Sequence, residues 1–124
     1  MPTPEQMTST VHGYVEGFAN ADVEAIVALF AEDAVVEDPV GTPPKAGHDA
    51  IRAFYAFSVG TGAKLHLEGP IRIGPDYAAF AFQVRLTMDG KVATVDVIDV
   101  FRFNEAGKVR RMEAYFGPGN FTGM

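Results

Sequence analysis

The sequence contains no cysteine, which excludes disulfides, thiol nucleophiles, zinc ribbons and iron–sulfur clusters. Serine is also scarce: Ser9 and Ser58 are the only two, and neither lies in a G-x-S-x-G setting, so covalent acyl transfer is disfavoured. His12, His48 and His66 have no H-x-H or H-E-x-x-H spacing, so we expect surface histidines and no metal site. No glycine-rich loop opens a helix after a strand, and we expect no cofactor.

Basic residues are outnumbered as well. Sixteen acidic and ten basic residues give a formal charge of −6, which disfavours binding to nucleic acid and to anionic membranes. No apolar stretch approaches the ~20 residues of a membrane span, and the start lacks the features of a signal peptide. We therefore expect a soluble, cytoplasmic protein. Its 124 residues, 48% of them hydrophobic and 21% charged, are typical of one folded domain, which we expect to span residues 1–124.

The first part of the chain has helical periodicity. After Thr3-Pro4, apolar residues recur at three- and four-residue spacing, which predicts a first helix with Tyr14 on its buried face. Asp22 can cap a second helix, whose apolar stripe is expected to extend to Phe30. A third helix is predicted over about residues 49–58, with its apolar residues facing inward.

The second part of the chain changes to a period of two, which is typical of antiparallel strands joined by tight turns. A short strand at residues 34–38 is stopped by Pro39. Asp89-Gly90 is a typical hairpin turn between two longer strands. The longer strands are predicted at residues 64–73, 77–88, 91–103 and 108–116. Helices first and a meander afterwards predict an α+β domain in which helices cover one face of a curved antiparallel sheet.

Asp99 is unusual because it shares a strand face with Val97, Phe101 and Phe103. A carboxyl in such a row either points into a pocket or breaks the usual burial pattern. Apolar surroundings would raise its pKa and leave a neutral acid that can donate a hydrogen bond. Two alternatives stay open: the face is less buried than its apolar residues indicate, or Asp99 is paired with an arginine. The candidate partners are Arg72, Arg85 and Arg102.

Asp38 and Tyr14 are less specific when taken singly. Asp38 precedes a proline, where aspartate commonly forms a turn, and an inward tyrosine can simply pack. Asp96, on the opposite face of the Asp99 strand, is interpreted as structural or interfacial. Together, however, a carboxylate base and two neutral oxygen donors in an apolar cavity are what proton removal next to a ketone requires. The base takes the proton, and the donors stabilise the developing enolate oxygen.

The chain resembles the Δ5-3-ketosteroid isomerases, a family with the cone-shaped α+β fold shared by nuclear transport factor 2-like and cystatin-like proteins. The resemblance covers about residues 3–117, and the set Tyr14, Asp38 and Asp99 is its most specific part. The matching segments are Ile26-Val27-Ala28-Leu29-Phe30-Ala31, Val36-Glu37-Asp38-Pro39-Val40-Gly41, Ala50-Ile51-Arg52 with Phe54-Tyr55, Ile98-Asp99, Phe101-Arg102-Phe103-Asn104 and Ala106-Gly107-Lys108-Val109.

The resemblance implies a cofactor-free enzyme that isomerises 3-oxo-Δ5-steroids to 3-oxo-Δ4-steroids. It implies that Asp38 carries a proton from C4 to C6, while Tyr14 and Asp99 donate hydrogen bonds to the C3 oxygen. Tyr55 is implied to orient Tyr14, whereas Phe30 replaces a tyrosine of some relatives, so no longer chain of hydroxyls is expected. The apolar pocket wall implied by the resemblance, in which any residue could equally be plain core, consists of Phe54, Phe82, Val84, Val97, Phe101, Met112, Ala114 and Phe116.

A homodimer is implied as well, and Ile98 and Val100 on the second face of the Asp99 strand fit a covered sheet face. Two other functions stay open. One is a polyketide-cyclase-like enzyme of the same fold that acts on another enolisable ketone, and the other is a non-catalytic protein that carries hydrophobic ligands. A carrier has no need of Asp38 beside two oxygen donors, so the three-residue set favours catalysis.

Overall fold

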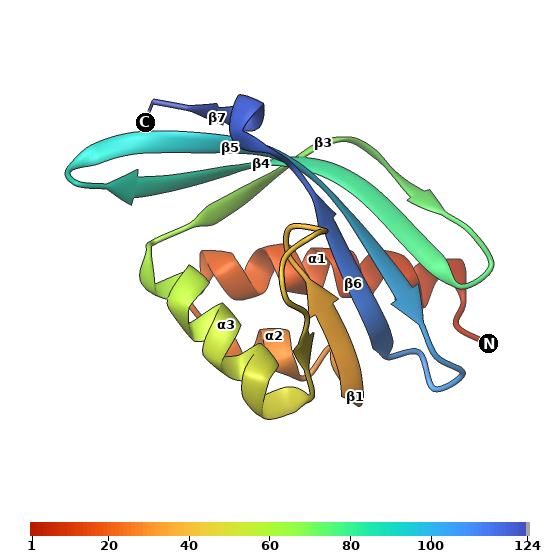
Figure 1. Cartoon of the computed structure of the whole chain (residues 1–124). Coiled ribbons are helices and arrows are strands. Elements are labelled where there is room, and N and C mark those ends of the chain that lie inside the picture. Colours follow the sequence, from red (N-terminus) through yellow and green to blue (C-terminus); the bar gives the residue numbers. More distant parts are fainter. Residues whose placement is uncertain (124) are drawn as a thin grey trace.

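Helices form the first part of the chain, as the periodicity predicts (Figure 1). The computed structural model describes residues 1–123. The helices in that range are α1 (Pro4–Ala19), α2 (Val23–Val27) and α3 (His48–Gly60). A capping box starts α1: Gln6 N–H donates to Thr3 Oγ1, and Thr3 N–H donates to Gln6 Oε1. The Asp22 side chain caps α2, as expected. Among the described residues no helix is long and apolar enough to cross a membrane.

The prediction that the second helix extends to Phe30 is wrong. α2 ends at Val27, and strand β1 (Phe30–Glu37) begins at Phe30, four residues before the predicted strand. Phe30 pairs in parallel with Val109, a residue far along the chain. Because apolar spacing reports only local order, it does not reveal this long-range pairing.

The four longer strands confirm the predicted meander. The structure adds two two-residue strands and a short 3-10 helix, η1 (Pro118–Asn120), which the sequence did not indicate. The remaining strands are β2 (Lys45–Ala46), β3 (Lys64–Ile73), β4 (Tyr77–Met88), β5 (Lys91–Phe103), β6 (Val109–Tyr115) and β7 (Phe121–Thr122). Asp89 and Gly90 both have positive φ, +51° and +78°, as a tight hairpin turn between β4 and β5 requires.

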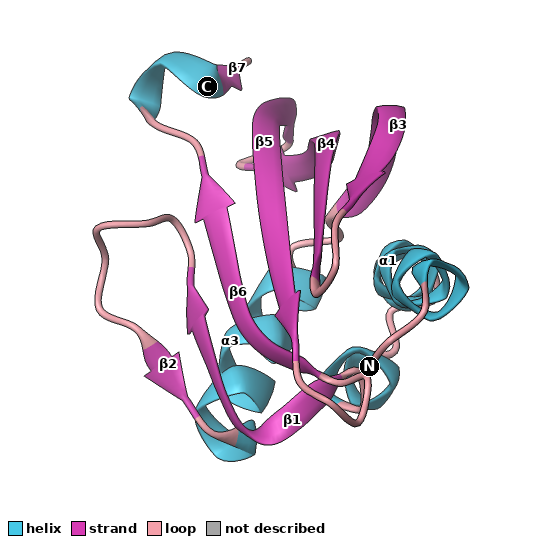
Figure 2. Cartoon of the chain, turned by 90° about the vertical axis from the view of Figure 1, so that its right-hand side faces the viewer, coloured by secondary structure: helices cyan, strands magenta, loops and turns pink. Residues whose placement is uncertain are grey.

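The strands form one curved sheet in the order β2-β1-β6-β5-β4-β3, with β7 added along part of β5. β1 and β6 are parallel, so the sheet is not antiparallel throughout, whereas the other neighbours are antiparallel. The helices lie on the inner face of this sheet (Figures 1 and 2). The architecture is therefore the mixed α+β fold that the sequence predicts.

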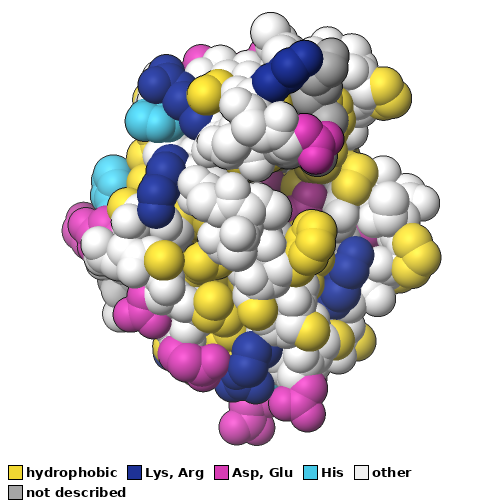
Figure 3. Space-filling view, turned by 90° about the vertical axis from the view of Figure 1, so that its left-hand side faces the viewer, with side chains coloured by type: hydrophobic (Ala, Val, Ile, Leu, Met, Phe, Trp, Pro, Cys, Tyr) yellow, Lys and Arg dark blue, Asp and Glu magenta, His cyan; other side chains and the backbone are white. Residues whose placement is uncertain are grey.

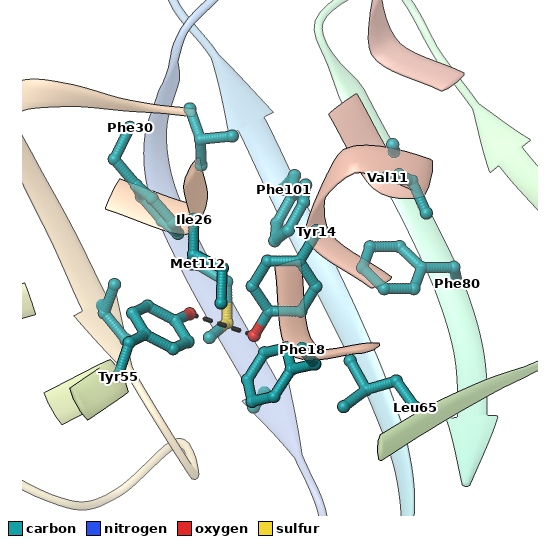
Figure 4. Packing of buried hydrophobic residues seen from close by; sticks show 14 of the residues in the cluster. Val11, Tyr14, Phe18, Ile26, Phe30, Tyr55, Leu65, Phe80, Phe101 and Met112 are labelled. Carbon is teal, nitrogen blue, oxygen red and sulfur yellow. Dashed lines mark hydrogen bonds between the residues drawn. The ribbon is translucent and has the colours of Figure 1, made fainter. Parts of the chain in front are cut away.

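Tyr14 lies at the centre of an aromatic cluster that joins α1 to α3 and to the sheet (Figure 4). Its ring meets those of Phe18, Tyr55, Phe80 and Phe101 edge-on, at centroid distances of 5.3, 5.7, 6.3 and 5.1 Å. Edge-to-face packing of this kind stabilises a particular orientation of each ring. The fold therefore positions the Tyr14 hydroxyl before any ligand arrives.

Candidate active site

A cavity of about 320 Å³ lies between the inner face of the sheet and helices α1 and α3. Its volume is near the lower end of the range for small-molecule sites. Tyr14, Asp38 and Asp99 all line it, so the structure brings the three predicted catalytic residues together. The molecular face seen in Figure 3 is hollowed, with hydrophobic side chains around the hollow and acidic side-chain atoms visible inside it.

The cavity wall matches the predicted wall only in part. The predicted residues that line the cavity are Phe54, Phe82, Val84, Val97 and Phe116. The other three predicted wall residues are fully buried in the core instead: Phe101, Met112 and Ala114. Several lining residues were not predicted, including Phe57 on α3 and Phe121 on β7. No local pattern marks Phe121, because only the pairing of β7 with β5 brings it to the cavity.

Asp99 is buried in the cavity wall without a hydrogen-bond partner. The side chain is 1% exposed, and neither carboxyl oxygen has a partner among the described residues. The arginines considered as partners bond elsewhere: Arg72 to a backbone carbonyl, Arg85 to a glutamine and Arg102 to a glutamate. Burial raises the pKa of Asp99 well above its usual value, and the negative charge of Asp38 raises it further. Burial of Asp99 therefore favours its neutral, protonated form.

Asp38 follows the last residue of β1 and is half-buried. The turn that carries it is anchored on both sides: Val40 N–H donates to Ala114 O at 2.8 Å, and Gly41 N–H donates to Glu37 Oε2 at 2.9 Å. The Asp38 carboxylate itself forms no hydrogen bond or ion pair within residues 1–123. Burial raises the pKa of Asp38 to about 6. The side chain is therefore a free base of near-neutral pKa on a fixed backbone.

Tyr14 and Tyr55 form a buried hydroxyl pair, with 3.0 Å between the two oxygens (Figure 4). Burial raises the pKa of both well above the usual value, so both stay protonated. When Tyr55 donates to Tyr14, the Tyr14 proton is free for a ligand oxygen in the cavity. The Phe30 ring packs on Tyr55 with centroids 5.7 Å apart and supplies no hydroxyl.

The remaining polar candidates lie outside the cavity lining. His12 and His66 are exposed, as expected. His48 is half-buried, and its Nε2 lies 2.8 Å from the Phe30 carbonyl oxygen. Asp96 is exposed and accepts a long hydrogen bond from Gln83 on the neighbouring strand. The chemistry is thus concentrated in one carboxylate, one neutral carboxylic acid and one phenol around an apolar space.

The chain is similar to known proteins in both sequence and structure. A family model described as a SnoaL-like domain matches residues 11–112, a range that contains all three catalytic candidates. A steroid Δ-isomerase from Nocardioides simplex is 33% identical over 117 residues, which is 94% of this chain and 94% of that protein. The solved structure of SalBIII, an epoxide hydrolase/cyclase-like enzyme with a role in pyran ring formation in the polyether salinomycin, matches with a TM-score of 0.93. That match covers 100% of both chains at 25% identity.

Proposed function

The chain belongs to the SnoaL-like family of the nuclear transport factor 2-like superfamily, and we propose that it is a steroid Δ-isomerase that converts 3-oxo-Δ5-steroids to 3-oxo-Δ4-steroids. The proposal is carried by Asp99, a fully buried carboxyl that has no partner and faces a cavity shared with Tyr14 and Asp38. A buried polar group without a partner costs free energy. A substrate oxygen that accepts a hydrogen bond from Asp99 removes that cost.

Asp38 is the base in this reaction. Its carboxylate removes a proton from C4, and the electron pair moves toward the C3 oxygen to give a dienolate. Asp38 then returns the proton to C6. The double bond moves from C5–C6 to C4–C5, and no atom is gained or lost overall. A base with a pKa of about 6 suits this task because it is ionised at neutral pH and yet accepts a proton readily.

Tyr14 and Asp99 stabilise the negative charge that develops on the C3 oxygen. Both are protonated donors in an apolar wall, where a hydrogen bond to a charged oxygen is stronger than in water. The aromatic cluster and Tyr55 hold the Tyr14 hydroxyl in place. Because these donors bind the dienolate more strongly than the ketone, they lower the barrier rather than merely bind the substrate.

The direct test is an ultraviolet assay for the conjugated enone formed from 5-androstene-3,17-dione. Enone formation at a rate proportional to the enzyme concentration supports the proposal. Tight steroid binding without turnover would instead indicate a carrier of hydrophobic ligands. A polyketide-cyclase-like enzyme is the second candidate, and the likeness to SalBIII favours it. Turnover of a non-steroid enolisable ketone or a hydroxy-epoxide, with no enone formed, would support that candidate.

Flat phenolic steroids such as equilenin should bind competitively, because a phenol oxygen imitates the enolate in front of Tyr14 and Asp99. Tyr14→Phe should weaken equilenin binding by about tenfold or more, since it removes a hydrogen bond to a partly charged oxygen. Fluorescence titration measures the affinity. Unchanged affinity in Tyr14→Phe, or binding that saturating substrate does not reduce, would show that the donors are placed wrongly.

We also propose a homodimer that forms through the outer face of the sheet. Ile98 on β5 and Tyr115 on β6 lie directly opposite each other on neighbouring strands. They are 50% and 46% exposed. Large apolar side chains that adjoin on a sheet face are typical of a surface covered by a partner. Sedimentation equilibrium should give twice the 13.3 kDa of one chain, and Ile98→Glu should give the monomer. A wild-type mass of one chain at micromolar concentration would contradict the dimer.

A further inference from the structure

Lys45 stands on the inner face of the sheet, where a lysine is uncommon. In the antiparallel β1–β2 pair, Lys45 lies directly opposite Val36, and residues that oppose each other project to the same side. Val36 is fully buried in the hydrophobic core that residues of α1, α3 and the sheet form together. The Lys45 side chain is therefore directed toward the cavity side of the sheet and is half-buried there.

The ammonium group of Lys45 lies over an aromatic ring instead of a carboxylate. Its Nζ is 4.9 Å from the centroid of Phe54, a residue of α3 that lines the cavity. Attraction between a cation and the face of a ring holds the ammonium in such a position. No ion pair between residues 1–123 includes Lys45. The positive charge is therefore localised without being neutralised.

Asp38 is the group on which this charge acts. It lies two residues beyond Val36, which Lys45 opposes, and it has the same inward direction. Burial raises the pKa of Asp38, and the charge of Lys45 lowers it. The neighbouring Glu37 is bound by Arg111 at 2.8 Å.

The other titratable groups that face Asp38 come from three elements. They are Tyr14 on α1, Tyr55 on α3 and Asp99 on β5. Burial raises the pKa of all three, which favours the neutral form of each. Lys45 is therefore the charged group through which the protein favours the ionised base.

We propose that Lys45 is a positioning residue for the general base: a cation held on the Phe54 ring that keeps Asp38 ionised without binding it. The role of Asp38 as base rests on the proposed function, whereas the electrostatic effect does not. A direct ion pair would fix the carboxylate and reduce its basicity, because an adjacent opposite charge lowers a carboxyl pKa by about 1–3 units. A cation held at a distance favours ionisation and leaves the carboxylate free to move between C4 and C6.

The test is the pH dependence of kcat/KM in Lys45→Met. Loss of the cation should move the acid limb from near pH 6 to higher pH by about half a unit. Activity should then fall about threefold at pH 5 and stay close to wild type at pH 8. Lys45→Arg keeps the charge and can stack on Phe54, so its limb should stay in place. Lys91→Met, which makes the same change at the first residue of β5, is the matched control and should also leave the limb unmoved.

Carbon-13 NMR titration of the Asp38 carboxyl in wild type and Lys45→Met gives a readout that needs no turnover. A higher titration midpoint in Lys45→Met supports the inference even if wild type forms no enone, in which case only the proposed function fails. An unmoved midpoint, or an equal shift in Lys91→Met, would overturn the role of Lys45. The spectra also report whether each variant is folded.

Discussion

Replacing Asp38 with asparagine should lower kcat by about 10²–10⁴-fold, the range associated with loss of a general base. The amide has nearly the shape of the carboxylate but cannot accept and return a proton. The substitution leaves the apolar wall proposed to bind the steroid unchanged, so steroid affinity should survive. The measurement is enone formation at saturating substrate, together with a steroid dissociation constant for the same preparation.

Asp33→Asn is the matched control for this variant. Asp33 lies on the same strand, β1, but is exposed and outside the cavity lining. It should retain wild-type kcat, which separates loss of the base from a general loss of one negative charge. Folded Asp38→Asn enzyme that keeps most of its kcat would remove Asp38 from the mechanism.

Asp99→Leu should lower kcat by about 10²–10³-fold, as the loss of one oxyanion donor does. An ionised carboxylate cannot donate to a negative oxygen, so Asp99 must be neutral, and its burial keeps it so. Asparagine retains a donor in its amide group. Wild type should therefore be fastest, Asp99→Asn modestly slower and Asp99→Leu slowest at neutral pH. In wild type, activity should fall again at alkaline pH when Asp99 or Tyr14 loses its proton.

Asp99→Leu should also be more stable than wild type. The pKa of Asp99 is raised in the folded state, so the folded protein holds a proton that the unfolded chain releases above its ordinary pKa of about 4. The stability of wild type therefore falls as the pH rises from about 4 toward the raised pKa of Asp99. Leucine removes both this loss of stability and the unpaired carboxyl. Asp99→Leu should show a higher Tm at pH 7 despite its lower kcat.

Two results would return Asp99 to a purely structural role. One is wild-type kcat in Asp99→Leu at neutral pH. The other is an infrared spectrum of the equilenin-bound enzyme that shows Asp99 as a carboxylate, because only the protonated form can donate.

Most of the strands could be predicted because their signals are local. Alternating residues and the Asp89-Gly90 turn define β4 and β5 without reference to the rest of the chain. The end of α2 could not be predicted, because Phe30 continues the helical spacing but pairs with Val109. β2 and β7 are two residues long and form only through pairing with β1 and β5.

The candidate site, too, could be predicted only where the signal is local. Alternation along β5 placed Asp99 in an apolar row, but a less buried face or an arginine partner stayed open until the structure showed its burial. Asp38 and Tyr14 depended on the family resemblance, because a turn aspartate and a buried tyrosine are common. Alternation predicts that Val97 and Phe101 both point inward, since they belong to the same strand face. It does not show that Val97 lines the cavity whereas Phe101 lies in the core. That difference depends on how α1 and α3 cover the sheet.

The most direct test of the proposed reaction uses a 3-oxo-Δ5-steroid with deuterium at both C4 positions, incubated with the enzyme in ordinary water. In the proposed mechanism Asp38 serves both carbons, so the conjugated enone should carry deuterium at C6, detected by mass spectrometry and NMR. Asp38→Asn should form this product far more slowly. No enone, or enzymatic enone with only hydrogen at C6, would contradict transfer by a single carboxylate.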